Sequence, residues 1–331
     1  MLEFSFIVIS IGRKWSKLSS LVRFMIVITF LGTVSGIPSR ERNHPAIALE
    51  YFYYRKDTML FDCGEGAQKQ LMKAGISFMD ISKIFITHWH ADHFAGLIPL
   101  LQTMNLEKRK NELTIFGPEA NRFVQGILNL GYFGLRFPIK AVDVPFEGRE
   151  IVKVYETKLY EILSVPVLHT IPSVAFAFKE KDVWRIDEKR LKELGLKRGK
   201  WLKELKEKGE VVYGGRRLRV EEVATLQKGL KVVYSGDTKP CENLIELSRD
   251  ADVLIHDATF LEEDEDVQKY HSSVKDAARV AKKANVKKLI LTHISRRYQK
   301  DDVERLLKEA KEVFENVEVA YDLMKVILKR E

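Results

Sequence analysis

The run at residues 88–93, His-Trp-His-Ala-Asp-His, constrains the fold more than any other feature of this chain. It places three imidazoles and one carboxylate within six residues, directly after an apolar stretch at residues 84–86. Only eight histidines occur in 331 residues, so a polar loop that is histidine-rich by chance explains the cluster poorly. Imidazole and carboxylate groups are ligands that zinc accepts in proteins. The run therefore predicts a metal site on a turn at the end of a strand.

Three further residues are candidate ligands because each follows an apolar run that is typical of a strand. They are His169, Asp237 and His293, and the runs end at residues 168, 235 and 292. Gly236, directly before Asp237, permits a close approach of the backbone to a metal. A lone histidine after a strand is more often structural than a ligand, so the residues alone leave the role of His169 open.

Short β-rich runs alternate with helical patterns along the chain, which favours an α/β layered fold. The sequence predicts strands at residues 25–31, 45–53, 58–61, 83–87, 113–116, 151–155, 163–168, 231–235, 252–256, 288–292 and 317–328. It predicts helices at residues 65–74, 93–105, 118–130, 241–249, 272–284 and 301–314. Either Ser272 or Ser273 could cap the helix at 272–284. All the candidate ligands named above follow strands, as expected for a site on the rim of a sheet sandwich.

Composition narrows the class of protein. With 45% hydrophobic residues, a chain of this length can bury a substantial core. The formal net charge of +8 favours a polyanionic partner. The two cysteines, Cys63 and Cys241, lie far apart in the sequence and neither belongs to a C-x-x-C pair. This spacing argues against a disulfide framework and predicts a reducing, cytoplasmic setting.

The first 24 residues differ from the rest of the chain. The apolar run at residues 2–11 is shorter than the roughly 20 residues that a membrane-spanning helix needs, and no membrane partner is expected. The basic residues Arg13, Lys14 and Lys17 follow that run, whereas those of a signal peptide precede it. We expect residues 1–24 to be an extension outside the fold, with Met25 as the natural start. A genuine anchor or targeting segment is the competing interpretation.

A basic stretch lies between two of the candidate metal motifs. Residues 189–219 hold twelve Lys or Arg against four Glu, a local balance of +8, together with five glycines and two helical patterns. One interpretation is a solvated, charged insertion. The other is an arm that grips phosphates away from the active site, which would make binding strongly salt-dependent.

The order of the motifs resembles the ribonuclease Z family of the metallo-β-lactamase fold. The segments that carry the resemblance are residues 30–33 (Phe-Leu-Gly-Thr), 61–66 (Phe-Asp-Cys-Gly-Glu-Gly), 88–93, 167–169 (Val-Leu-His), 235–238 (Ser-Gly-Asp-Thr), 256–260 (His-Asp-Ala-Thr-Phe), 271–273 (His-Ser-Ser) and 292–298 (Thr-His-Ile-Ser-Arg-Arg-Tyr). The resemblance implies an αββα sandwich over residues 25–331, with an inserted tRNA-binding arm at 180–222. The family arm usually has a Gly-Pro pair where this chain has Gly199-Lys200.

The resemblance also implies a set of metal ligands, with two zinc ions per chain. His88, His90 and His169 would hold one ion, Asp92, His93 and His293 the other, and Asp237 would bridge them. Imidazole and carboxylate ligands suit manganese as well as zinc. Two such ions can generate the attacking hydroxide and stabilise an in-line displacement at phosphorus.

Other residues would assist the chemistry. In the family, the histidine matching His271 contacts the scissile phosphate and protonates the leaving 3′ oxygen. Its partner there is a glutamate, and this chain has the shorter Asp257. Asp92 could act as a base as well as a ligand, and Asp62 is expected to orient a metal-bound histidine. Arg42 and Arg296 are weaker candidates for contacts with RNA phosphate or ribose, because a guanidinium suits phosphate oxygens.

The implied function is endonucleolytic removal of the 3′ trailer from precursor tRNA after the discriminator nucleotide, which leaves a 3′-hydroxyl. Family members are usually homodimers, so the resemblance implies a homodimer. Two alternatives stay open at this point. One is another dinuclear hydrolase of the same fold that acts on small phosphodiesters, thioesters or lactams. The other is a non-catalytic RNA-binding protein with a relict metal site.

Overall fold

The structure is a computed structural model that describes residues 24–53, 55–130, 134–267 and 270–330. Residues 1–23 of the expected N-terminal extension lie outside the described residues. The first described strand begins at Phe24 and includes Met25. Among the residues that the structure describes, none of the helices is both long and apolar enough to cross a membrane.

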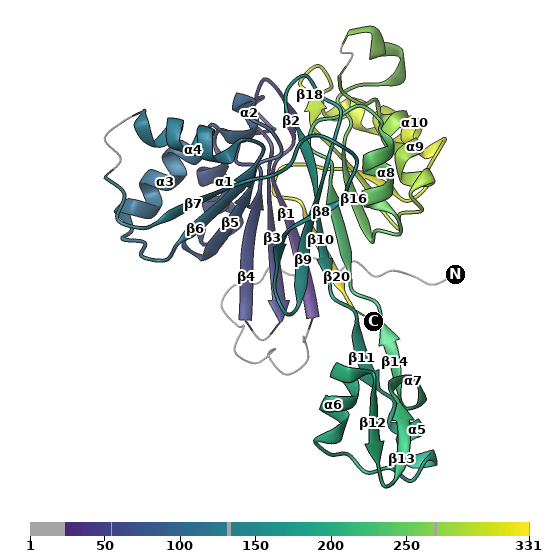
Figure 1. Ribbon diagram of the computed structural model, residues 1–331. Helices are drawn as coiled ribbons and strands as arrows, with labels where there is room; N and C mark the ends of the chain where they lie inside the picture. Colours follow the sequence, from purple (N-terminus) through teal and green to yellow (C-terminus); the bar gives the residue numbers. More distant parts are fainter. Residues whose placement is uncertain (1–23, 54, 131–133, 268–269, 331) are drawn as a thin grey trace.

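Two seven-stranded sheets lie face to face and form the centre of the fold (Figure 1). The first sheet has the strand order β20 (Lys325–Lys329), β1 (Phe24–Gly32), β3 (Ala46–Tyr53), β4 (Arg55–Phe61), β5 (Ile81–Phe85), β6 (Leu113–Gly117) and β7 (Ile139–Asp143). The second has the order β19 (Val317–Val319), β17 (Leu289–Thr292), β16 (Val253–Asp257), β15 (Lys231–Tyr234), β10 (Val174–Glu180), β9 (Tyr160–Pro166) and β8 (Val152–Glu156). A short parallel pair, β2 (Val34–Ser35) with β18 (Ile294–Ser295), joins the two halves of the chain.

Helices cover the outer face of each sheet, so the predicted αββα sandwich is confirmed. The first sheet carries α1 (Ala67–Ala74), α2 (Ala91–Phe94), α3 (Leu97–Leu106) and α4 (Ala120–Asn129), with η2 (Phe78–Asp80) before β5. The second carries α8 (Glu242–Ser248), α9 (Val274–Lys283) and α10 (Val303–Lys311), with η3 (Glu262–Val267) and η4 (Lys300–Asp302) in the connections. Period-2 alternation sends one set of strand side chains inward, where Phe30, Phe176 and Ile255 are almost fully buried between the sheets.

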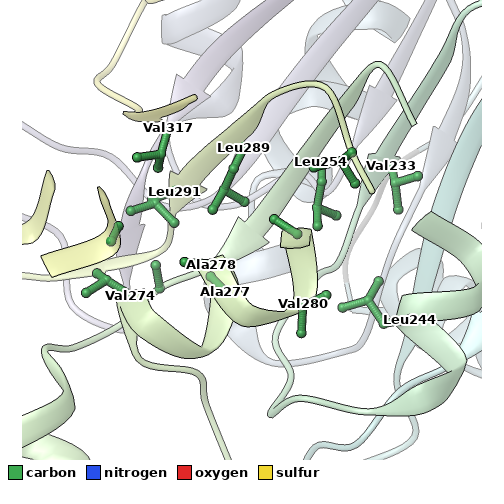
Figure 2. Close-up of a cluster of buried hydrophobic side chains, with 14 of the residues drawn as sticks. Val233, Leu244, Leu254, Val274, Ala277, Ala278, Val280, Leu289, Leu291 and Val317 are labelled. Atoms are coloured by element: carbon green, nitrogen blue, oxygen red, sulfur yellow. The ribbon is translucent and has the colours of Figure 1, made fainter. Parts of the chain in front are cut away.

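Helix α9 shows how local sequence fixes the outer layer. Ser273 caps its N-terminus, because the hydroxyl accepts the Asp276 N–H while the Asp276 carboxylate accepts the Ser273 N–H. The buried face of the helix packs its alanines against leucines of β16 and β17 (Figure 2). Small residues on the helix let it approach the sheet closely. This packing fixes the segment around residue 271, which directly precedes the helix.

Several predicted elements differ from those observed. The helix predicted at 93–105 is broken into α2 and α3 at Gly96, where a Cβ would collide with the carbonyl of Gly64. The strand predicted at 317–328 is two strands in different sheets, β19 and β20, separated by a turn in which Leu323 has φ 68°. Strand β10 was not predicted, although it lies in the interior of the second sheet, between β15 and β9.

The insertion between β10 and β15 extends away from the sandwich as an arm (Figure 1). It contains β11 (Val183–Ile186), α5 (Glu188–Glu193), α6 (Trp201–Lys208), β12 (Glu210–Tyr213), β13 (Arg216–Arg219), α7 (Val220–Val223) and β14 (Ala224–Gln227). Strands β11 and β14 pair as a two-stranded neck. The arm has its own small core around Leu191, Leu205 and Val223. Many of its basic side chains are ion-paired within the arm, such as Arg198 with Glu188.

Candidate metal centre

The candidate ligands meet at one edge of the sandwich because each follows the carboxyl end of a strand. The 88–93 segment follows β5, and His169 follows β9. Asp237 follows β15, and His293 lies between β17 and β18. Two sheets therefore contribute to one cluster, which rigid elements hold in place.

The structure brings all seven predicted ligands together, and Asp237 is central. Its Oδ2 lies 3.6 Å from His88 Nε2, 3.3 Å from His93 Nε2 and 3.2 Å from His293 Nε2. Asp92 Oδ2 lies 3.6 Å from the Nε2 atoms of both His93 and His293. The donor atoms fall into groups whose members lie within 4.8 Å of one another: His88, His90 and His169; Asp92, His93 and His293; His88, His93 and Asp237; and Asp237, Asp257, His271 and His293.

Unpartnered buried atoms show that this donor set fits a cation. His93 Nε2, His293 Nε2 and Asp237 Oδ1 are buried and have no hydrogen-bond partner. Buried polar groups in folded proteins are almost always paired. Several unpaired metal-ligating atoms in one cluster therefore indicate that a cation binds between them. Imidazole nitrogens and carboxylate oxygens are the chemistry that a divalent transition-metal ion requires.

The protonation states of the cluster agree with this fit. Burial lowers the pKa of His88, His90 and His169, which keeps each imidazole neutral and its lone pair available to a metal. Burial also opposes charge on His93 and His293, but the surrounding carboxylates, with Asp237 the largest contributor, together outweigh it and raise the pKa of both. A proton on those two rings thus serves the same electrostatic purpose as a bound cation, because it offsets buried carboxylates.

A buried carboxylate, Asp62, orients one of the candidate ligands, as expected from the sequence. Its Oδ2 lies 2.7 Å from His93 Nδ1 and accepts the Tyr234 hydroxyl at 2.8 Å. Its Oδ1 accepts the Thr87 N–H at 2.8 Å. With Nδ1 bound to Asp62, His93 presents Nε2 to the cluster. Burial and then Asp62 raise the pKa of Tyr234, so its hydroxyl stays protonated and donates.

Replacing Asp62 with alanine is expected to weaken metal binding by about 10- to 100-fold, because an outer carboxylate fixes the tautomer and orientation of its histidine. Metal affinity is measured by competition with a chromogenic chelator. Tyr234→Phe is the matched control, since it removes one hydrogen bond to the same carboxylate and leaves His93 paired. Equal affinities for wild type and Asp62→Ala would contradict this role.

The backbone is strained and closely packed at the site. Asp62 has φ 55° and His293 has φ 60°, both in the left-handed region that residues other than glycine rarely adopt. Gly236 has φ 59°, and a Cβ there would lie 2.7 Å from Thr87 Cβ. This glycine therefore permits a close approach to Thr87, and the close approach to a metal stays a prediction.

Asp257 supports two histidines at once. Its Oδ2 lies 2.9 Å from His271 Nδ1, so the shorter side chain reaches its partner. Its Oδ1 accepts the Thr259 hydroxyl at 2.7 Å, and that hydroxyl oxygen lies 3.0 Å from His293 Nδ1. Backbone N–H groups of Thr238 and Thr259 also donate to the carboxylate. Burial opposes charge on His271, but Asp257 outweighs it and raises the pKa of the imidazole.

The two arginines named from the sequence differ in position. Arg42 turns inward, and its Nη1 donates to Thr33 Oγ1 and to the Ala320 carbonyl at 2.7 Å each. It therefore holds the first loop against the body. Arg296 is exposed. The supporting residues Thr87, Tyr234 and Thr259 were missed by sequence reasoning, although each stands beside or within a metal motif.

Comparisons with known proteins agree with this fold. The sequence matches the family described as Anti-Pycsar protein Apyc1 over residues 26–190 and the Beta-lactamase superfamily domain over residues 218–294. Ribonuclease Z of Methanosarcina acetivorans is 42% identical over 307 residues, which cover 91% of this chain and 98% of that protein. Ribonuclease Z of Pyrococcus abyssi is 43% identical over 277 residues, which cover 83% and 88%.

Solved structures give the same result. The crystal structure of the short form of human tRNase Z has a TM-score of 0.63 and 27% sequence identity, and the match covers 91% of this chain and 98% of that one. The metallo-β-lactamase fold protein YhfI from Bacillus subtilis has a TM-score of 0.64 at 19% identity, a likeness of fold alone. Sequence identity of 42% along 91% of the chain shows that it belongs to the ribonuclease Z family, endoribonucleases that hydrolyse phosphodiesters on the metallo-β-lactamase fold.

Proposed function

We propose that this endoribonuclease removes the 3′ trailer from precursor tRNA after the discriminator nucleotide and leaves a 3′-hydroxyl. The observation that carries the proposal is the convergence of seven ligand-type side chains and the His271–Asp257 pair on one edge of the sandwich. The relatives named ribonuclease Z and the similarity to human tRNase Z support tRNA as the substrate. We include two zinc ions per chain, a homodimeric assembly and a cytoplasmic location in the proposal.

The geometry supports the two proposed ligand sets. His88, His90 and His169 would hold one ion, Asp92, His93 and His293 the other, and Asp237 lies between the two sets. Bound divalent ions supply charge that stabilises a phosphoryl transition state and lower the pKa of water. Asp92 Oδ2 lies 3.6 Å from Nε2 of both histidines of its set, and its second proposed role is as the base for the attacking water.

His271 is the proposed general acid for the leaving 3′ oxygen. Its Nδ1 is engaged by Asp257, so Nε2 is the ring nitrogen left to carry a proton toward substrate. The side chain is 15% exposed, which makes it reachable at the rim of the cluster. The carboxylate partner favours the imidazolium form that an acid needs.

The direct test is cleavage of a 3′-extended precursor tRNA, with the product end mapped to the nucleotide. We expect one cut after the discriminator, a 3′-hydroxyl, and loss of cleavage after metal is removed with a chelator. Turnover of small phosphodiesters with precursor tRNA left intact would instead support the alternative dinuclear hydrolase. Fewer than two metals per chain and no cleavage would support the relict site.

The pH profile tests the proposed acid. Asp257 raises the pKa of His271, so Asp257→Asn is expected to lower it. Cleavage needs protonated His271, so activity falls as pH rises through this pKa. The alkaline limb of kcat should therefore move to lower pH in Asp257→Asn. Metal content is measured in parallel, because Asp257 also supports His293 through Thr259.

His271→Ala serves as the reference in the same experiment. It should reduce kcat by roughly 10²- to 10⁴-fold, the usual contribution of a positioned acid, and abolish the limb assigned to His271. An alkaline limb that stays at the same pH in both variants would remove His271 from the role of acid.

A further inference from the structure

The arm leaves the sandwich through a narrow root. Residues 180–182 lead from β10 into β11, and residues 228–230 lead from β14 back to β15. Glu180 and Leu230 exchange two hydrogen bonds, one from the Glu180 N–H to the Leu230 carbonyl and one from the Leu230 N–H to Glu180 Oε2, each 2.9 Å. Beyond this point only the two-stranded neck continues.

A charged pair is buried at this root. Arg330 Nε lies 3.1 Å from Glu180 Oε2, and the two side chains are 5% and 0% exposed. Arg330 Nη2 also donates to the Lys181 carbonyl at 2.8 Å. Arg330 directly follows β20, at the edge of the first sheet, whereas Glu180 ends β10 of the second sheet. The pair therefore ties both sheets to the segment from which the arm emerges.

Close packing surrounds the pair. The Gly229 N–H donates to Asp182 Oδ1 at 2.8 Å, so the outgoing and returning segments are joined a second time. A Cβ at Gly229 would collide with the Glu180 carbonyl, which makes this crossing too tight for any other residue. Burial and then the Glu180 carboxylate raise the pKa of Tyr51 of β3, so its hydroxyl stays protonated.

Within the part of the chain that the structure describes, little else fixes the direction of the arm. Its buried residues, such as Leu202 and Val220, form a cluster of their own, separate from the clusters on either side of the two sheets. A two-stranded ribbon alone is a weak and pliable connection. The orientation of the arm relative to the metal centre is therefore decided mainly by contacts at the root.

We propose that Glu180 and Arg330 form a clamp that sets the direction of the arm, and that Arg330 is thereby a positioning residue for RNA bound to the arm. The inference rests on the proposed function for its effect on tRNA, and on the geometry of the root for its effect on the arm. A clamped arm presents a bound substrate in a defined direction and so raises its effective concentration at a metal centre, and a loose arm does not.

The test variant is Glu180→Gln combined with Arg330→Met, which removes both charges and leaves neither one buried alone. Arg330→Met by itself would strand a buried carboxylate and could unfold the root. The matched control is Glu161→Gln with Lys179→Met, a neighbouring pair with the same 3.1 Å separation whose lysine is 45% exposed. Arg330→Lys is the conservative variant, which keeps the charge and loses the planar fork.

Two readouts are taken on each full-length protein. Spin labels at Glu207 on the arm and Gln125 on α4, both exposed positions, report the spread of arm–body distances in a Cys241→Ser background. Kinetics with precursor tRNA and with bis(p-nitrophenyl) phosphate report substrate positioning and the metal chemistry separately. We expect the double variant to broaden the distance distribution and to raise KM for precursor tRNA on the order of tenfold. Turnover of the small ester should stay at the wild-type level.

The outcomes separate the clamp from the function. If the wild type does not cut precursor tRNA but the distances broaden only in the clamp variant, the clamp stands and the proposed function falls. An unchanged distance distribution in the clamp variant overturns the clamp. Broadened distances with an unchanged KM for precursor tRNA overturn the positioning role of Arg330. If Arg330→Lys partly restores the narrow distance distribution and the low KM, and the control pair changes neither, both the clamp and the positioning role of Arg330 are supported.

Discussion

Replacing Asp237 with alanine is expected to reduce the rate of phosphodiester cleavage by roughly a thousandfold or more. Loss of one preorganised polar group at a reacting centre typically costs a rate factor of about this size. Its Oδ2 lies within 3.6 Å of a nitrogen on each of His88, His93 and His293, so it is shared by both proposed ligand sets. Losing it removes charge from two metal positions together. We therefore expect metal content to fall below two ions per chain.

The number of metal ions per chain is measured by atomic emission. The cleavage rate is measured with both precursor tRNA and a small phosphodiester. Asp252→Ala is the control, because Asp252 accepts a backbone N–H from Lys231 at the start of the same strand, β15, that ends before Asp237. Two tightly held ions and a rate within tenfold of the wild type would show that Asp237 does not lie between the metals.

Removal of the arm is expected to separate substrate recognition from bond cleavage. Val183 and Gln227 face each other in the neck, so an Asn-Gly turn could replace residues 184–226 and join the two strands. The arm's core is its own, so the sandwich should fold without it. We expect kcat/KM for precursor tRNA to fall by on the order of 100-fold or more as the second binding contact is lost. The rate with a small phosphodiester should not change.

The salt dependence of kcat/KM for precursor tRNA provides the control for this prediction. Each lost phosphate contact makes the slope of log kcat/KM against the logarithm of salt concentration less steep by about one. A variant that keeps the arm but replaces the exposed Lys197, Lys200 and Lys206 with glutamine should lower that slope and leave the fold intact. If the arm-less protein cleaves precursor tRNA as well as the wild type, the insertion is only a solvated surface element.

The candidate ligands could be named from the sequence because each belongs to a motif at a strand end. The supporting contacts could not, since they join distant segments: the Tyr234 hydroxyl reaches Asp62 across 172 positions of sequence. The interior strand β10 could have been predicted, because Pro172 and Ser173 separate its apolar run at residues 174–178 from the loop after His169. The net charge of residues 189–219 did not show that many of those charges pair locally, as Arg217 does with Glu210.

Because the arm has a separate core, it is expected to unfold separately from the sandwich. Segments unfold together only when they share packed surface, and the arm shares little with the sandwich. A cluster built on Leu191, Leu205 and Val223 is much smaller than the three that hold the sandwich, so gentle heating should melt the arm first. The partly melted protein would still hold its metal centre. Stress would thus turn a selective enzyme into an indiscriminate one before it became inactive.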